Sequence, residues 1–334
     1  MRRILSLLTA FAVCLTFYGT DTHVKVRNKD ANITLAGTLS LPDSQNPKAF
    51  FVLASGSGAQ NRDEEVIGHR PFKVIADTLV AEGFGVLRMD DRGIGQSEGD
   101  FASAILDDFT GDALSGVAFI RERYPDAKVG ILGHSQGGQV AVKAAAADKV
   151  DFIVTLAGPA WKGDSIVMSQ ARALAVATTG SWPNEALQRR LLDIAMSGLS
   201  DPIAKSMLFM EFAKQLGDMI TVPQVQDQIY RQIDPLLSPM YKDMLLYDPA
   251  DDIRAVKVPW IALNGDKDLQ VLVANLKTFE ELNPDVKTYV LPDHNHLFQP
   301  AFTGLPTEYP TAGKSPSDKT LEVLITAISE TLQF

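Results

Sequence analysis

A serine stands at the centre of residues 133–137, which read Gly-His-Ser-Gln-Gly. The mostly apolar residues 128–132 before it indicate a short buried strand, and the alanine-rich residues 138–147 after it indicate a helix. A strand-to-helix turn this sharp strains the backbone at Ser135, and it needs small residues two positions away, which Gly133 and Gly137 supply. The turn would expose the serine hydroxyl at the positive end of the helix. The pattern therefore predicts that Ser135 is a nucleophile.

A serine hydroxyl becomes reactive only when a neighbouring base removes its proton, and the chain has five histidines that could serve. His134 lies within the turn, where its side chain is expected to point away from the hydroxyl and to pack. His23 lies beside the N-terminus, and His69 lies in a polar loop that it is expected to brace. His294 and His296 remain, in the loop after the last predicted strand, and both stay open as the base.

An acid is expected to orient the histidine and to stabilise its charged form. The loop after the predicted strand 260–263 reads Asn-Gly-Asp-Lys-Asp and offers two carboxylates. Asp268 is favoured because it ends the loop next to the following helix. Asp266 is the alternative, although an aspartate in a glycine turn commonly braces that turn. Asp164, after an earlier strand, is a third and weaker alternative.

Acyl transfer on a serine also requires N–H donors for the oxyanion that develops in the reaction. The backbone N–H of Gln136, directly after the serine, is one expected donor. The second is expected from Ser57, in the Ser-Gly-Ser-Gly stretch 55–58 that follows the predicted strand 49–54. The glycines of this stretch let the backbone approach a substrate carbonyl closely. The charged residues 62–64 could touch the substrate, but they are expected instead to pin this loop through an internal ion pair.

The elements that must position these residues alternate between strand and helix. Two antiparallel strands are predicted first, at 23–26 and 33–41. Further strands are predicted at 49–54, 85–89, 128–132, 151–157, 258–263 and 286–291, and helices at 72–82, 109–124, 138–147, 271–282 and 317–332. Repeated strand–helix units predict a mostly parallel central sheet with helices on both faces.

The alternation is interrupted between residues 159 and 258, where helices are predicted at 165–178, 185–196 and 203–216. We expect one α/β core, formed by residues 21–158 and 259–334, with residues 159–258 inserted as a helical lid. Methionine fills irregular apolar space and forms adaptable binding surfaces. Seven of the nine methionines fall in this insertion, which predicts a lid that lines an apolar acyl pocket: Met168, Met196, Met207, Met210, Met219, Met240 and Met244.

The N-terminus has a different character from the rest of the chain. Arg2 and Arg3 precede an apolar run at 4–18, which is short for a transmembrane span but suits a secretory signal peptide. We therefore expect residues 1–20 to be a leader and the protein to be exported, periplasmic or secreted, with no stable membrane association after cleavage. An uncleaved N-terminal anchor is the alternative, because no clear Ala-x-Ala cleavage site precedes residue 20.

Composition argues against several classes of function. The 334 residues are 46% apolar and 22% charged, as in an ordinary globular enzyme. The net charge of −10 argues against nucleic acid as the main partner. Cys14 is the only cysteine, so neither an intramolecular disulfide nor a cysteine metal cluster is expected. The chemistry is expected to use no metal and no cofactor.

Several stretches together resemble the α/β-hydrolase superfamily, and within it small bacterial carboxylesterases related to dienelactone-hydrolase-like and serine-aminopeptidase-like enzymes. Residues 56–64 resemble the oxyanion loop of that group, and residues 91–97 resemble the Asp-x-x-Gly-x-Gly-x-Ser stretch of the superfamily. Residues 264–271 resemble the acid loop and residues 295–299 the histidine loop. The resemblance covers nearly the whole chain after the leader, and it implies the α/β-hydrolase fold.

The resemblance also decides between the open alternatives, because it implies a triad of Ser135, Asp268 and His296 with Ser57 and Gln136 as the oxyanion donors. The implied function is a serine carboxylesterase that hydrolyses short- to medium-chain carboxylic esters through an acyl-enzyme, with a small-molecule ester as its partner.

Two other readings of the same residues stay open. A serine aminopeptidase or an acyl-thioester hydrolase would use the same triad. An aminopeptidase would also need an acidic group near the lid to hold the substrate ammonium, and Glu185, Asp193 and Glu211 are available. From another class, a non-catalytic receptor would use the fold alone, but the presence of all the triad residues argues against it.

Overall fold

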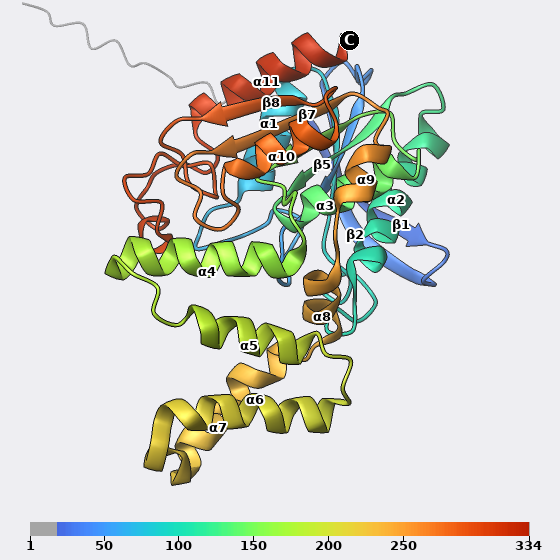
Figure 1. The fold of residues 1–334 in the computed structure, drawn as a ribbon. Helices are drawn as coiled ribbons and strands as arrows, with labels where there is room; N and C mark the ends of the chain where they lie inside the picture. Colours follow the sequence, from blue (N-terminus) through green and yellow to red (C-terminus); the bar gives the residue numbers. More distant parts are fainter. Residues whose placement is uncertain (1–18, 334) are drawn as a thin grey trace, which may run out of the picture.

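The computed structural model describes residues 19–333, and its strands form one eight-stranded sheet in the order β1-β2-β4-β3-β5-β6-β7-β8 (Figure 1). The first strands, β1 (Thr20–Asn28) and β2 (Ile33–Leu41), are antiparallel to each other. β2 is also antiparallel to β4 (Gly85–Met89), whereas every pair from β4 across to β8 is parallel. The predicted mostly parallel sheet is confirmed.

Four of the five inner parallel strands are buried at every residue, whereas the edge strand β8 is partly exposed. Their unbroken apolar sequences follow from this position, because helices cover both faces of a parallel sheet and leave no side of a strand in water. The four fully buried strands are β3 (Phe50–Ala54), β5 (Val129–His134), β6 (Ile153–Leu156) and β7 (Trp260–Gly265), and the edge strand is β8 (Lys287–Leu291).

Two layers of helices cover the sheet, as the sequence predicted. Each layer closes its own apolar core, so the sheet is held from both sides. The first layer consists of α2 (Leu106–Arg123), α3 (Gln136–Ala146), α9 (Ala250–Ala255) and α10 (Ala274–Leu282). The second consists of α1 (Pro71–Ala81) and α11 (Asp318–Leu332).

A helical region, defined here as α4 to α8, follows β6. Figure 1 shows α5, α6 and α7 projecting away from the sheet, with α4 and α8 between them and the body of the molecule. The region consists of α4 (Gly163–Thr179), α5 (Glu185–Ala195), α6 (Asp201–Leu216), a short 3-10 helix η1 (Gly217–Thr221), α7 (Pro223–Leu236) and α8 (Pro239–Leu246).

The sequence reading of this region missed its last helices. α7 and α8 each begin at a proline, which is a favoured first residue of a helix because its missing N–H has no intrahelical partner there. The expected insertion also extended to residue 258, but α9 lies within that range and packs with the core through Ile253. The last residues of the expected insertion therefore belong to the layer of helices that covers the sheet.

One helix of the core begins earlier than its apolar spacing indicated. α2 begins at Leu106 rather than at Phe109, because the Asp108 carboxylate accepts a hydrogen bond of 3.0 Å from the backbone N–H of Ile105. This acidic residue satisfies a donor at the start of the helix, where the helix provides no acceptor of its own.

Residues 1–18 of the expected leader, which include Cys14, lie outside the described residues. Within residues 19–333, no helix combines the length and the apolar composition that a membrane crossing requires.

Candidate active site

The predicted site residues gather at the carboxyl ends of four strands. Ser57 follows β3, Ser135 follows β5, Asp268 follows β7 and His296 follows β8. These strands are parallel, so their carboxyl ends meet at one edge of the sheet, where folds of this class bind their ligands.

The turn at Ser135 is strained and closely packed. Ser135 has φ 52° and ψ −120°, in the left-handed region of φ that residues with a side chain rarely adopt. A Cβ on Gly133 would lie 1.9 Å from the carbonyl oxygen of Gly137, and a Cβ on Gly137 would lie 2.0 Å from that of Ala54. Only glycine fits at either position, so the surrounding backbone enforces the strained conformation.

Asp268 and His296 form a buried pair. The Asp268 Oδ2 lies 2.7 Å from His296 Nδ1, and its Oδ1 accepts from the backbone N–H groups of Gln270 at 2.8 Å and Val271 at 2.9 Å. Because a carboxylate can only accept hydrogen bonds, Nδ1 of the histidine donates and Nε2 is left with its lone pair. This is the tautomer that can take a proton from a serine hydroxyl.

The loops that carry this pair are packed backbone to backbone. A Cβ on Gly265 would lie 2.1 Å from the carbonyl oxygen of His294, and the N–H of Lys267 donates to that same oxygen at 3.0 Å. The side chain of Asn295 accepts from the N–H groups of Leu297 and Gln299, each at 3.0 Å. These contacts fix the position of His296 relative to the acid loop.

The alternative residues of these loops have structural partners instead. Nδ1 of His294 lies 2.7 Å from the carbonyl oxygen of Pro292, and Nε2 lies 2.8 Å from Oγ of Ser317. Asp266 accepts from the N–H of Asp293 at 2.6 Å, so it links its loop to the loop after β8 rather than bracing its own glycine turn. Neither side chain is placed to serve the Ser135 turn.

His134 is more than the packing residue expected from the sequence. Its Nδ1 lies 2.9 Å from a carboxylate oxygen of Glu64, and its Nε2 lies 3.0 Å from the carbonyl oxygen of His296. Burial acts to lower the pKa of His134, but the Glu64 carboxylate raises it and prevails, so the pKa lies above its usual value. Both neighbours of the ring are acceptors, which also favours the doubly protonated form.

The loop expected to supply the second oxyanion donor lies against the nucleophile. A Cβ on Gly56 would lie 3.3 Å from Cβ of Ser135, and the N–H of Gly56 donates to Glu64 at 2.7 Å. Ser57 lines the same cavity as Ser135 and Gln136. The structure thus brings together Ser135 and both residues whose N–H groups were expected to bind an oxyanion.

The charged residues after this loop form internal ion pairs, as expected, with partners on other elements. Arg62 pairs with Asp90 at 2.6 Å, and Asp63 pairs with Arg88. With Glu64 bound to His134, all three residues 62–64 bind outside their own segment rather than one another. The sequence could not show this, because each partner lies on another element. His69 braces its surroundings as expected, 2.9 Å from the carbonyl oxygen of Tyr309.

A cavity of about 430 Å³ lies over Ser135, between the body and the helical region. It lies within the range of roughly 300–1,000 Å³ that is usual for small-molecule sites. No charged side chain lines it. Its apolar wall comes mainly from α4 and α8, through Ile166, Val167, Met240 and Met244, and its polar groups include Gln139, Gln170, Gln270 and Tyr241.

The expectation about the methionines needs correction. Of the set expected over the acyl pocket, only Met240 and Met244 line the cavity. Met207, Met210 and Met219 are 40%, 59% and 58% exposed. They lie on α6 and η1, which project away from the sheet, so their sequence position in the insertion was not enough to place them at the site.

The sequence reading also missed polar residues of the cavity. Gln139 lies one helical turn after Gln136 on α3, and this i, i+3 spacing puts both on one face. From that spacing the sequence could have indicated that Gln139 lies on the same face as Gln136. Gln170 and Tyr241 belong to α4 and α8, whose packing over the site has no signature in the sequence. Among residues 19–333, no cluster of histidines, cysteines and carboxylates could hold a metal ion.

The strand order, the helix layers and the strained serine turn are those of the α/β-hydrolase fold. The family model described as "Serine aminopeptidase, S33" matches residues 69–231, a segment that contains Ser135 but neither Asp268 nor His296. Similarity to that model therefore bears on the nucleophile and not on the remainder of the triad.

Two esterases and an α/β hydrolase are similar to this chain. Esterase EstD from Thermotoga maritima is 26% identical over 279 residues, which are 80% of this chain and 59% of that protein. A solved esterase from Pyrococcus furiosus is 15% identical, with a TM-score of 0.60 over 97% of this chain and 96% of its own. The α/β hydrolase GrgF from Penicillium sp. sh18 is 15% identical, with a TM-score of 0.60 over 94% of this chain and 100% of its own. The solved structures share the fold.

Proposed function

We propose that the protein is a serine carboxylesterase that hydrolyses uncharged esters of short- to medium-chain acids. The observation that carries the proposal is the uncharged cavity over Ser135, beside a hydrogen-bonded pair of Asp268 and His296. The esterase names of the Thermotoga and Pyrococcus relatives support it.

In the proposed reaction, Oγ of Ser135 attacks the ester carbonyl while Nε2 of His296 takes the hydroxyl proton. The tetrahedral oxyanion is bound by the N–H groups of Ser57 and Gln136, and Asp268 stabilises the imidazolium. His296 then gives its proton to the departing alcohol, which leaves an acyl group on the serine. A water activated by His296 releases the acid and restores the enzyme.

The positions of the acidic residues favour an ester over an aminoacyl substrate. The aminopeptidase alternative would need a carboxylate beside the cavity, and none lines it. Glu211 is held by cations of its own region, and Asp193 pairs with Arg189 at 2.9 Å. Asp164, once an alternative for the acid, pairs with that same arginine at 3.0 Å. Glu185 lines a separate groove along α4.

The apolar wall of the cavity suits an acyl chain, and its size limits the length of that chain. Each CH₂ group that leaves water contributes about 0.8 kcal/mol, or roughly a fourfold gain in kcat/KM. We therefore expect kcat/KM to rise with chain length until the cavity of about 430 Å³ is filled, and to fall beyond that length.

The test is a series of p-nitrophenyl esters of increasing chain length, assayed beside aminoacyl p-nitroanilides, acyl thioesters and the negatively charged p-nitrophenyl hemisuccinate. Ser135→Ala serves as the blank for each substrate. The proposal expects a maximum at a short or medium neutral ester and weak activity on the charged ester. A kcat/KM for an anilide or a thioester that equals or exceeds that of the best ester would contradict it.

We also propose that the helical region acts as a lid, because α4 and α8 supply the apolar wall of the cavity.

We further propose that the protein is exported to the periplasm or the medium, because the cations Arg2 and Arg3 before an apolar run are typical of a secretory leader. Cell fractionation with N-terminal sequencing of the mature protein tests this proposal of export. An intact N-terminus found in the membrane fraction would favour the anchored alternative.

A further inference from the structure

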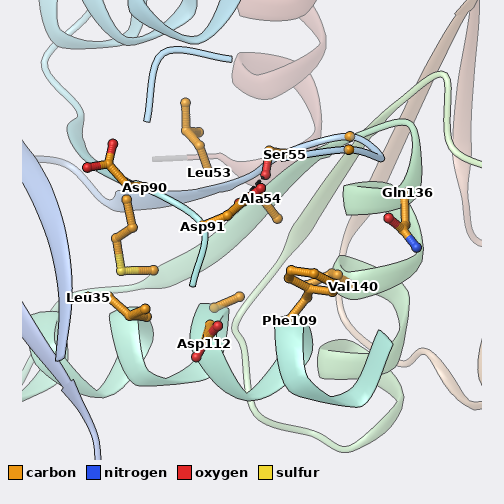
Figure 2. A pocket seen from close by; sticks show the side chains of 14 residues that line it. Leu35, Leu53, Ala54, Ser55, Asp90, Asp91, Phe109, Asp112, Gln136 and Val140 are labelled. Carbon is orange, nitrogen blue, oxygen red and sulfur yellow. Dashed lines mark hydrogen bonds between the residues drawn. The ribbon is translucent and has the colours of Figure 1, made fainter. Parts of the chain in front are cut away.

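A small internal cavity of about 40 Å³ lies behind the loop that carries Ser57, and the Asp91 carboxyl group points into it (Figure 2). Figure 2 shows Asp91 and Ser55 facing each other, while Asp112 faces the same space from α2. Asp91 does not line the cavity over Ser135. Asp91 therefore makes no direct contact with a substrate in that cavity, and the hydrogen bonds of its carboxyl group run to the loop that carries Ser57.

The Asp91 carboxyl group ties both ends of that loop together. Oγ of Ser55 donates to Oδ1 at 2.6 Å, and the backbone N–H of Gln60 donates to Oδ2 at 2.9 Å. The segment between these two residues contains Ser57. Its side chain is exposed, and Gly58 has φ 93°, so little packing holds this segment in place. Hydrogen bonds must do so instead.

We propose that Asp91 is a positioning residue that sets the N–H of Ser57 where it binds the oxyanion, an inference that rests on the proposed esterase function. A single donor to an oxyanion typically contributes roughly 100- to 1,000-fold in kcat. Without these two ties the loop keeps the bond from the Gly56 N–H to Glu64 and the bond from the Asp91 N–H to the carbonyl oxygen of Gln60, at 3.1 Å. The end at Ser55 would be released and the end at Gln60 weakened, which would misplace the Ser57 N–H and lower kcat. Because the oxyanion forms only after the substrate has bound, KM should change little.

The bonding around Asp91 suits an amide as well as a carboxylate. Burial raises the pKa of Asp91 to about 7, against the hydrogen bonds from Ser55 and Gln60, and the carboxylates of Glu64 and Asp112 add to the rise. Both forms therefore exist near neutral pH. The ionised form accepts from both partners, whereas the neutral acid accepts from Gln60 and donates to Oγ of Ser55.

The other charged groups around this cavity are already paired. Glu64 is bound to His134 at 2.9 Å, Asp112 to Arg92 at 2.7 Å, and Asp90 to an arginine of its own. None of them bonds to Asp91. An asparagine in place of Asp91 can present an acceptor to Gln60 and a donor to Ser55, so it should preserve the loop.

The experiment compares Asp91→Ala, Asp91→Asn and Ser55→Ala with the wild type on the best p-nitrophenyl ester and on a trifluoromethyl ketone. The ketone adds to Ser135 and forms a tetrahedral oxyanion, so its inhibition constant reports the oxyanion site without turnover. For Asp91→Ala we expect kcat to fall at least about tenfold, KM to stay within about threefold, and the inhibition constant to rise as kcat falls. Asp91→Asn should restore kcat to within about threefold of the wild type.

Asp112→Asn is the matched control for a structural effect. Asp112 lines the same cavity, but it bonds to Arg92 and to Asn28, each at 2.7 Å, rather than to the loop. Removing the charge that partners Arg92 should lower Tm while leaving kcat and the inhibition constant of the folded enzyme unchanged. A positioning role predicts the opposite pattern for Asp91→Ala. The kcat of the folded enzyme falls, and any decrease in Tm is too small to account for that loss by unfolding.

Two results would overturn the inference. One is a wild-type kcat and inhibition constant in Asp91→Ala, and the other is an Asp91→Asn enzyme as impaired as Asp91→Ala. If Asp91→Ala does not fold, Ser55→Ala decides, because it removes only one tie: a smaller parallel loss in kcat and inhibitor binding supports the inference, and wild-type values refute it. A wild type that hydrolyses no ester would instead refute the proposed function, and this inference with it.

Discussion

The body and the helical region of this protein hold their side chains in different ways. In the body, β3, β5, β6 and β7 are buried at every residue, and backbone contacts with glycine fix the loops that carry the candidate triad. The helical region has small apolar clusters of its own and leaves large apolar side chains in solvent, among them Ile203, Met207 and Met210.

This difference predicts two kinds of mutational effect. A side chain added at Gly133, Gly137 or Gly265, in the loops of the site, meets backbone that cannot move without displacing the site. A side chain changed in the helical region meets other flexible side chains, which can adapt. Substitutions in the body should therefore act mainly on kcat and on stability, and substitutions in α4 or α8 mainly on the KM of longer substrates.

The largest effects are expected at the base and the acid. His296→Ala and Asp268→Asn should each lower kcat by roughly 10,000-fold, because one removes the base and the other its orienting acceptor. His294→Ala and Asp266→Asn are the matched controls from the same loops, and they should be much milder. Steady-state kinetics on the best ester, with Tm measured for each variant, gives the comparison. A greater loss of kcat in His294→Ala than in His296→Ala would show that the wrong histidine has been assigned.

The next largest effect concerns the closely packed serine turn. In Gly133→Ala the new Cβ would lie 1.9 Å from a carbonyl oxygen, so the turn must shift. A shift of about 1 Å at reacting groups costs roughly 100-fold in rate, and overpacking costs about 1–3 kcal/mol of stability. The matched control is Gly111→Ala on α2, where the nearest atom would lie 3.7 Å away. Kinetics and thermal unfolding measure both; equal behaviour of the two variants would contradict the account.

In the helical region the expected effects are smaller and depend on the substrate. Met240→Ser and Met244→Ser should raise KM for medium-chain esters by up to about tenfold and leave acetate esters nearly unchanged, because they remove apolar contact with the chain. Met207→Ser and Met210→Ser are controls, since these side chains are exposed and do not line the cavity. An increase in KM in the controls as large as that at Met240 would place the acyl chain elsewhere.

The smallest effect is on the pH dependence of stability. The folded-state pKa of His134 is raised. The pairing with Glu64 therefore contributes its full stability below the unfolded pKa of about 6.5, and this contribution is lost as pH rises through the folded pKa. Tm measured against pH for the wild type and Glu64→Gln should differ more at pH 6 than at pH 9. A difference that grows toward alkaline pH would contradict the charged pair.

The sequence was informative wherever the chemistry depends on local geometry. The serine turn needs glycines at fixed spacing, and the loops after β7 and β8 carry short polar stretches that follow strands directly. These features occupy a few consecutive residues, so the sequence could indicate Ser135 and the two loops that carry the acid and the base. The choice of Asp268 and His296 within those loops came from the resemblance to a known family. The mostly parallel sheet was equally readable, because strands buried on both faces are apolar throughout.

The sequence was uninformative where distant elements meet. The pairing of Glu64 with His134 and the bonds of Asp91 to Ser55 and Gln60 join separate loops, and no spacing along the chain encodes them. The sequence could not distinguish the methionines of the insertion from one another. Tertiary packing places Met240 at the cavity and leaves others in solvent.

The central claim is that Ser135 is the nucleophile of an ester hydrolase, and a fluorophosphonate probe read by intact mass and peptide mapping tests it most directly. We expect one adduct per wild-type chain, located on Ser135. We expect no adduct on a folded Ser135→Ala variant, whose kcat should fall by roughly four to six orders of magnitude. An adduct on another residue, or a clean Ser135→Ala preparation that retains more than about a hundredth of wild-type activity, would contradict the claim.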